Sequence, residues 1–120
     1  MAELQTITQK EIDEYNLLDP LLDTLFDEVK TFSSKKQDVQ LNRFKVKTIN
    51  RVLTRVKELI GTDPMSNFLD LLDEDELPTN SDAVLVMAQF QSALAKYKAS
   101  REYHDTASYS TKWLTKDKKH

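Results

Sequence analysis

Two runs of charged side chains are the parts of this sequence that could do chemistry. The first is basic, because Arg43, Lys47, Arg51 and Arg55 recur every four positions and Lys57 lies close by. Residues four apart form a row on one side of a helix. Such a row can neutralise nucleic-acid phosphates or meet an acidic protein surface. These five residues are the candidate interaction surface.

The second run is acidic and consists of Asp70 together with residues 73–76. Carboxylates are suitable ligands for a hard cation, but a calcium loop alternates its ligands around a central glycine. This run neither alternates nor contains a glycine. We therefore expect a solvated acidic stretch and no metal site.

The sequence predicts no catalytic residue and no cofactor. A phosphate-binding loop needs several closely spaced glycines, and the chain has one. The chain has no cysteine, and its two histidines, His104 and His120, are sixteen positions apart, which is not a zinc-binding spacing. We expect His104 to be a surface residue. The protein is accordingly predicted to be non-enzymatic, with no small-molecule substrate evident.

The charge of the chain is unevenly distributed. The net charge is −3, but residues 1–27 carry −6, residues 28–60 carry +6, residues 61–83 carry −7 and residues 84–120 carry +4. Alternating blocks of this kind can neutralise one another within a bundle or between copies. The overall acidity argues against nucleic-acid binding, since nucleic-acid-binding domains are usually basic.

Residues 43–60 are predicted to form the central amphipathic helix. Its basic row lies opposite an apolar stripe that needs buried partners. Gly61, the only glycine, is expected to end this helix with a positive φ. The start is less defined, because Ser34, Val39 and Leu41 are all plausible. The apolar stripe consists of Val46, Ile49, Val52, Leu53, Val56, Leu59 and Ile60.

Two helices are predicted before this one. Thr8 and Glu11 have the spacing of a capping box, which indicates a helix over about residues 9–17. Asp19 and Pro20 are suited to the N-cap and first position of a second helix that runs to about Phe32. The alternative is a single helix with a kink at Pro20.

Two more helices are predicted after Gly61. Asp63-Pro64 repeats the N-cap arrangement and begins a short helix that frays through residues 73–76. Asn80-Ser81 is expected to cap the last long helix, which runs to about His104. Residues 83–87 are apolar on nearly every side, and we expect them to be the most buried part of the chain.

Residues 105–120 form a polar, basic tail that we expect to be flexible. Trp113 and Leu114 interrupt it and are the candidate tail anchor. They dock back on the helices, are simply exposed or bind a partner, and docking or simple exposure is the favoured interpretation. The domain organisation is thus one helical domain over residues 1–104 followed by the tail.

The predicted fold is all-α: a compact antiparallel bundle of four to five helices in a single domain. Asn-Gly and Asp-Gly pairs are absent, which argues against β-hairpins. The predicted core consists of Leu18, Leu22, Leu25, Phe26, Val29, Ile49, Val52, Leu53, Val56, Ile60, Phe68, Leu69, Leu72, Val86, Phe90, Leu94 and Tyr97.

The function predicted from these features is a helical protein–protein interaction module. It would act as an adaptor, accessory subunit or inhibitor of a larger complex, either with a protein partner or by self-association. The alternative is a small nucleic-acid-binding subunit that uses the basic side of residues 43–60. The sequence shows neither a signal-peptide core nor an apolar run of membrane-spanning length, so we expect a cytoplasmic protein without membrane contact.

Overall fold

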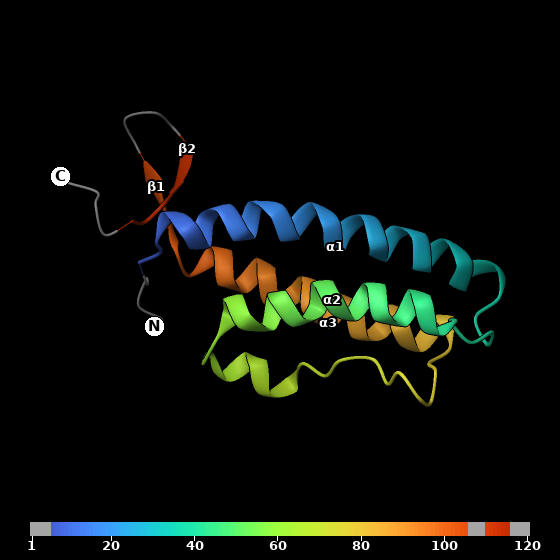
Figure 1. Ribbon diagram of the computed structural model, residues 1–120. Coiled ribbons are helices and arrows are strands. Elements are labelled where there is room, and N and C mark those ends of the chain that lie inside the picture. The colour runs from blue at the N-terminus through green and yellow to red at the C-terminus, as the bar shows by residue number, and fades with distance from the viewer. Residues whose placement is uncertain (1–5, 106–109, 116–120) are drawn as a thin grey trace.

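The computed structural model describes residues 6–105 and 110–115 as three α-helices and a small β-hairpin (Figure 1). Residues 1–5, 106–109 and 116–120, which include His120 and most of the predicted tail, lie outside the described residues. The prediction of four to five helices was wrong, because the described residues form three α-helices and a hairpin and are mostly helical rather than all-α. The elements are α1 (Gln9–Lys35), α2 (Arg43–Ile60), the 3₁₀ helix η1 (Pro64–Phe68), α3 (Asn80–Ala99), β1 (Glu102–Asp105) and β2 (Ser110–Trp113).

Helix α1 is one element of 27 residues, so the alternative of a single helix through Pro20 is right and the prediction of two helices was wrong. The predicted capping box is confirmed: the Thr8 hydroxyl accepts a hydrogen bond from the Glu11 N–H at 3.2 Å, and the Glu11 carboxylate accepts from the Thr8 N–H at 3.0 Å. Pro20 does not end the helix. Its ring lies on the exposed side, while Leu18 and Leu22 on either side of it are fully buried. Their packing offsets the one hydrogen bond that proline removes.

Helix α2 has the predicted bounds and the predicted stripe. It begins after Asn42, whose side-chain oxygen accepts from the Lys45 N–H at 2.8 Å, so the start near Leu41 was close and the starts at Ser34 and Val39 were wrong. Ser34 instead lies within α1 and donates to the Thr31 carbonyl. Gly61 follows α2 with φ of 65° and donates its N–H to the Lys57 carbonyl at 2.9 Å, which confirms the predicted role.

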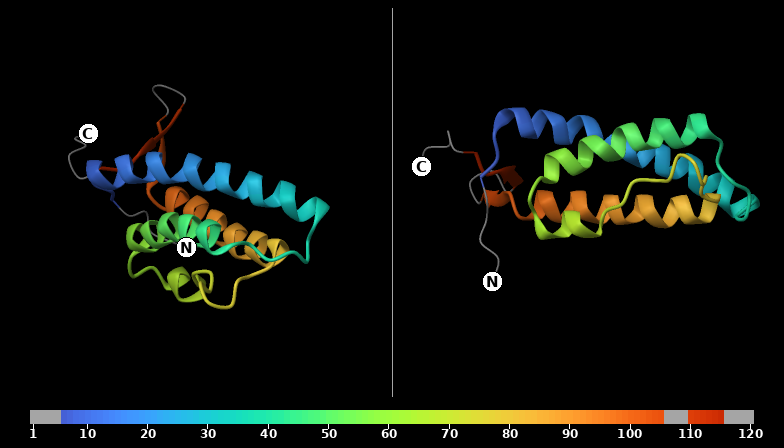
Figure 2. Two further views of the ribbon diagram at one scale, coloured as in Figure 1. Left: turned by 45° about the vertical axis from the view of Figure 1, so that its right-hand side comes forward. Right: turned by 60° about the horizontal axis from the view of Figure 1, so that its bottom comes forward.

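The chain after Gly61 is less helical than predicted. Asp63 caps η1 by accepting from the Met65 N–H at 3.0 Å, but the helix ends at Phe68 and does not continue through residues 73–76. The segment that follows η1 continues to α3 without regular secondary structure (Figure 2). Leu69 and Leu72 are buried as predicted, whereas Phe68 is 77% exposed, so its assignment to the core was wrong. The 3₁₀ helix has only five residues, so it has too little surface to bury the side chains of both Phe68 and Leu69.

Helix α3 begins one residue earlier than predicted and ends earlier. Thr79 is the N-cap, and its hydroxyl accepts from the Asp82 N–H at 3.2 Å. Within residues 83–87, Ala83 and Met87 are fully buried, but Leu85 is 62% exposed. The prediction that the first turns of this helix are buried on every side was therefore wrong. The last predicted turn is replaced by β1, in which His104 pairs with Thr111 of β2.

The core lies between the three helices, where α1 packs most extensively on α3 (Figure 2). The predicted core residues other than Phe68 are buried or pack against the buried set. The two ends of the described chain also meet: the Ile7 N–H donates to the Leu114 carbonyl at 2.8 Å, and the Leu114 N–H donates to the Arg101 carbonyl at 2.7 Å. Buried hydrophobic residues that the predicted core omitted are Ile7, Ile12, Tyr15, Leu41, Val46, Ala83, Met87 and Ala93.

Candidate interaction surface

The predicted basic surface divides into exposed and structurally engaged residues. Arg43, Lys47 and Arg51 are exposed on the outer side of α2. Within residues 6–105 and 110–115, none of the three takes part in an ion pair. Their charges are therefore available to a partner in solution, subject to screening by salt.

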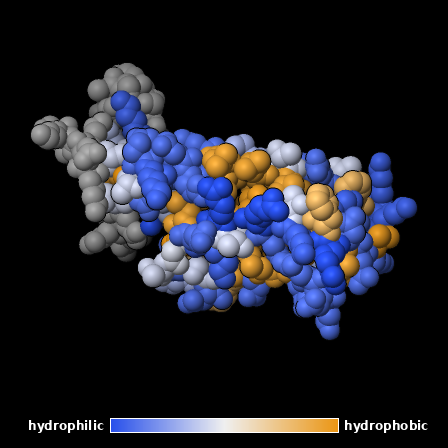
Figure 3. Space-filling model, in the orientation of Figure 1, coloured by the Kyte–Doolittle hydropathy of each residue, from blue (hydrophilic) through white to orange (hydrophobic). Residues whose placement is uncertain are grey.

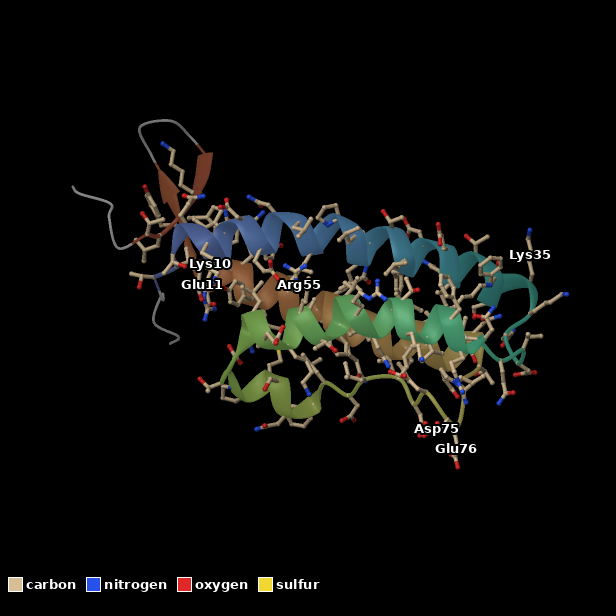
Figure 4. All side chains as sticks on the ribbon, in the orientation of Figure 1. Lys10, Glu11, Lys35, Arg55, Asp75 and Glu76 are labelled. Carbon is tan, nitrogen blue, oxygen red and sulfur yellow. The ribbon has the colours of Figure 1, made fainter. Side chains whose placement is uncertain are left out.

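Arg55 is engaged with α1. Its Nε donates to Glu14 Oε2 at 2.8 Å, and its Nη2 donates to Glu14 Oε1 at 2.5 Å. This bidentate ion pair joins the two helices. Figure 4 places Arg55 between α1 and α2. Both side chains remain partly exposed, so the pair contributes about 1 kcal/mol at most. Its main consequence is to set Glu14 level with Arg55 along the antiparallel helices.

Lys57 is engaged with the segment that follows η1. Its Nζ donates to the Leu69 carbonyl at 2.7 Å and holds the segment after η1 against the helix. Of the five residues predicted to form one surface, three are thus exposed together, one forms an interhelical ion pair and one is structural.

An apolar groove lies between α1 and α2, beside the basic row. It has a volume of 230 Å³ and lies toward the end of the bundle where α1 stops. Phe44 of α2 is 78% exposed at its rim, and Phe32 of α1 is half exposed beneath the Lys45 ammonium group, 4.4 Å from the ring centre. The residues that line the groove are Leu25, Glu28, Val29, Phe32, Phe44, Lys45, Thr48 and Ile49.

Exposed leucines extend this apolar surface along α1. Leu17 and Leu21 are each more than two-fifths exposed and stand at four-residue spacing before the groove residue Leu25. Figure 3 shows hydrophobic side chains gathered over the middle of the face that α1 and α2 form. We call the groove together with Leu17 and Leu21 the α1–α2 face.

The two helices of this face carry opposite charge. Helix α1 contains seven acidic and three basic residues, a net charge of −4, whereas α2 contains six basic and one acidic residue, a net charge of +5. These totals count all sides of each helix. The charged residues that line the groove are Glu28 of α1 and Lys45 of α2, whereas Asp23 of α1 is turned toward α3 and accepts from Gln91. A docking partner therefore meets an apolar surface with a charge of each sign at its edge.

The candidate tail anchor lies against the helices. The Trp113 ring meets Tyr15 edge-to-face, with centres 5.1 Å apart, and Tyr15 stacks on Tyr97 at 6.3 Å. The Arg101 guanidinium covers the other part of this cluster, 3.9 Å from the Tyr97 ring centre. Leu114 is held by the two backbone hydrogen bonds described above. These aromatic contacts attach the hairpin to the start of α1.

Burial strongly favours the neutral form of the two tyrosines in this cluster. Desolvation, with smaller contributions from the negative charges of Asp19, Glu102 and Asp23, raises the pKa of Tyr15 to about 12. Desolvation also raises the pKa of Tyr97 to about 12, and the Glu11 charge adds to this effect. The Tyr97 hydroxyl is buried without a hydrogen-bond partner in the described part of the chain.

The acidic run is exposed and turned away from the bundle. Figure 4 shows Asp75 and Glu76 projecting from the segment after η1. The Asp73 carboxylate accepts from the N–H groups of Glu76 and Asp75, and these bonds lower the pKa of Asp73. Across the described ranges, no group of three or more His, Cys, Asp or Glu side chains is placed to hold a metal ion.

Sequence reasoning missed Phe44 and the exposed side of α1. Phe44 lies on the polar arc of residues 43–60, and this off-pattern aromatic residue is the signal that identifies the groove. On α1 the signal is the width of the apolar stripe, since Leu21 and Phe32 follow the same helical spacing as Leu18, Leu22 and Val29, and one helical contact cannot bury them all.

No protein-family model matches the chain, and neither a curated protein nor a solved structure shows significant similarity to it. None of the helices in the described residues is long and apolar enough to cross a membrane. The geometry and charge of the α1–α2 face therefore carry the functional argument.

Proposed function

We propose that this protein is a non-enzymatic interaction module, an adaptor, accessory subunit or inhibitor within a larger assembly, that docks through the α1–α2 face. The exposure of Phe44 is the observation that carries the proposal. An aromatic ring in contact with water on an otherwise highly charged helix adds nothing to the fold and is typical of the anchor residues of interfaces.

The surroundings of Phe44 support this interpretation. The groove beside it is lined by aliphatic and aromatic side chains with few polar groups, as in the centre of a protein interface. Charged residues stand on both sides, where they act as a polar rim that steers a partner and excludes wrong ones.

The proposal is tested by comparing two matched phenylalanines. Phe44 and Phe68 are about equally exposed but lie on different elements. We expect the full-length protein, used as bait in extract of its native cells with chemical crosslinking, to lose its specific partners on Phe44→Ser substitution. Recovery should fall about tenfold or more, since loss of an anchor costs ≥ ~2 kcal/mol.

The Phe68→Ser variant is the control and should recover the same partners as the wild-type protein. Circular-dichroism melts of both variants should match that of the wild type within a few degrees, because neither ring is buried. Equal recovery by all three proteins would overturn the role of the α1–α2 face.

A second candidate function is nucleic-acid binding through Arg43, Lys47 and Arg51, because their charges are exposed and not used in ion pairs within the described ranges. Fluorescence anisotropy with labelled single- and double-stranded DNA and RNA tests it. If it is correct, affinity falls steeply with salt and the Lys47→Glu/Arg51→Glu double variant abolishes binding. Absence of binding at low salt would remove this candidate.

A further inference from the structure

We infer that a second pocket, at the end of the bundle where α1 stops, is a binding site for a small organic anion with an apolar body. The pocket has a volume of 340 Å³, which is within the range of small-molecule sites. It lies where the end of α1 meets the starts of α2 and α3 (Figures 1 and 2). The inference goes beyond the proposed function, because this pocket shares only Phe32 and Lys45 with the groove of the α1–α2 face.

Hydrogen bonds between distant segments build the walls of this pocket. The Leu41 N–H donates to the Pro78 carbonyl at 2.8 Å, and the Asn80 N–H donates to the Val39 carbonyl at 2.9 Å. Asn80 lines the pocket although it is only 5% exposed, and its Nδ2 donates to the Lys36 carbonyl at 2.9 Å. These bonds are internal to the chain, so the walls are formed before a ligand binds and little backbone ordering opposes binding.

The charged side chains that line the pocket are all basic. Lys35 and Lys36 come from the end of α1, and Lys45 comes from the first turn of α2. Asp38 belongs to the connecting loop but is not a lining residue. Within residues 6–105 and 110–115, none of the three lysines forms an ion pair. A cleft lined by charge of one sign concentrates ligands of the opposite sign, so the pocket favours an anion.

The starts of two helices add to this preference. Asn42, the N-cap of α2, and Asn80, the first residue of α3, both line the pocket. The N-terminal end of a helix carries a partial positive charge. The oxygen of Asn42 caps the Lys45 N–H, whereas its Nδ2 makes no hydrogen bond with the described residues. That amide group can therefore donate to an anion held by the lysines.

The apolar lining determines the rest of the ligand. Phe32 and Val39 are each about half exposed, and the Lys45 ammonium group lies 4.4 Å from the centre of the Phe32 ring. Leu41 is buried beside them. A hydrocarbon or aromatic group in the pocket would remove the exposed apolar surface from water while its anionic group meets the lysines. The ligand class is thus a carboxylate or phosphate attached to a short apolar body.

Titration of the isotope-labelled full-length protein with octanoate, octyl phosphate and octanol tests this inference by NMR. The three probes have the same hydrocarbon chain and differ in the head group. The anions should shift the amide signals of Val39, Asn42 and Lys45 with a Kd below about 1 mM, and octanol should bind at least tenfold more weakly. The tighter anion identifies the preferred head group. No shift by either anion, or octanol binding within tenfold of both, would overturn the inference.

Two double variants with the same change in net charge locate the site. Lys36→Gln with Lys45→Gln removes two ammonium groups from the pocket, whereas Lys10→Gln with Lys96→Gln removes two elsewhere. Figure 4 shows Lys10 at the opposite end of α1 from Lys35. All four substituted lysines are exposed, so both variants should fold.

The pocket variant should bind the tighter anion at least tenfold more weakly than the wild type, and the control variant should bind it as the wild type does. A pocket variant with unchanged affinity, or a control that loses as much, would overturn the assignment of the site. The protein-capture experiment with Phe44→Ser is independent of this result, because Phe44 does not line this pocket.

Discussion

Replacing Asn50 with alanine is expected to lower the free energy of unfolding by about 3 kcal/mol, because each buried polar group left unpaired costs ~1–3 kcal/mol. Asn50 is only 5% exposed. Its Nδ2 donates to the Leu72 carbonyl at 2.8 Å, and its Oδ1 accepts from the Leu72 N–H at 2.9 Å. Alanine leaves both backbone groups of Leu72 buried without these partners.

Urea denaturation measures this loss, and hydrogen exchange at the Leu72 amide locates it. Asn42→Ala is the matched control, since Asn42 belongs to the same helix but is exposed and makes one capping bond. That variant should lose about 1 kcal/mol. A loss for Asn50→Ala no larger than the control, with unchanged protection at Leu72, would show that the two bonds do not hold the segment after η1.

Raising the pH above 10 is expected to destabilise the protein through Tyr15 and Tyr97. Both phenols have a pKa near 10 when unfolded and about 12 when folded. Between these values the unfolded chain binds fewer protons than the native one, so the free energy of unfolding falls as pH rises. The stabilisation is complete below pH 10 and decreases up to about pH 12, by up to about 3 kcal/mol for each tyrosine.

The Tyr97→Phe variant isolates one of these contributions. It removes a buried hydroxyl that has no hydrogen-bond partner among the described residues, so it should gain about 1 kcal/mol at neutral pH and lose less stability at alkaline pH. Trp113 is the only tryptophan and stands against Tyr15, so its fluorescence follows unfolding at this cluster. Absorbance titration of native Tyr97 near pH 10 would contradict the prediction.

Local signals predicted most of the helical structure. The capping box at Thr8 and the stripe of residues 43–60 are short-range patterns, and both gave the right element. The errors lie where tertiary packing decides. Pro20 remained within α1 because the residues around it are buried, and the aromatic contacts of Trp113 fix a hairpin that has no Asn-Gly or Asp-Gly turn signal.

The candidate surface was only partly predictable for the same reason. The four-residue spacing placed Arg43, Lys47 and Arg51 correctly on an exposed row. The partners of Arg55 and Lys57 come from other elements, which helical periodicity does not reveal. The opposite charges of α1 and α2 were visible as blocks in the sequence, but only their antiparallel packing places them side by side.

The bond between Ile7 and Leu114 has a consequence for the order of folding. It joins residues 107 positions apart and so closes nearly the whole described chain into a ring. The entropy lost in closing a loop grows with its length, by about 0.6 kcal/mol for each doubling. We therefore expect helices α1 and α3 to pair first and bring the two ends together. The hairpin is then expected to dock last, on a bundle whose helices have already packed.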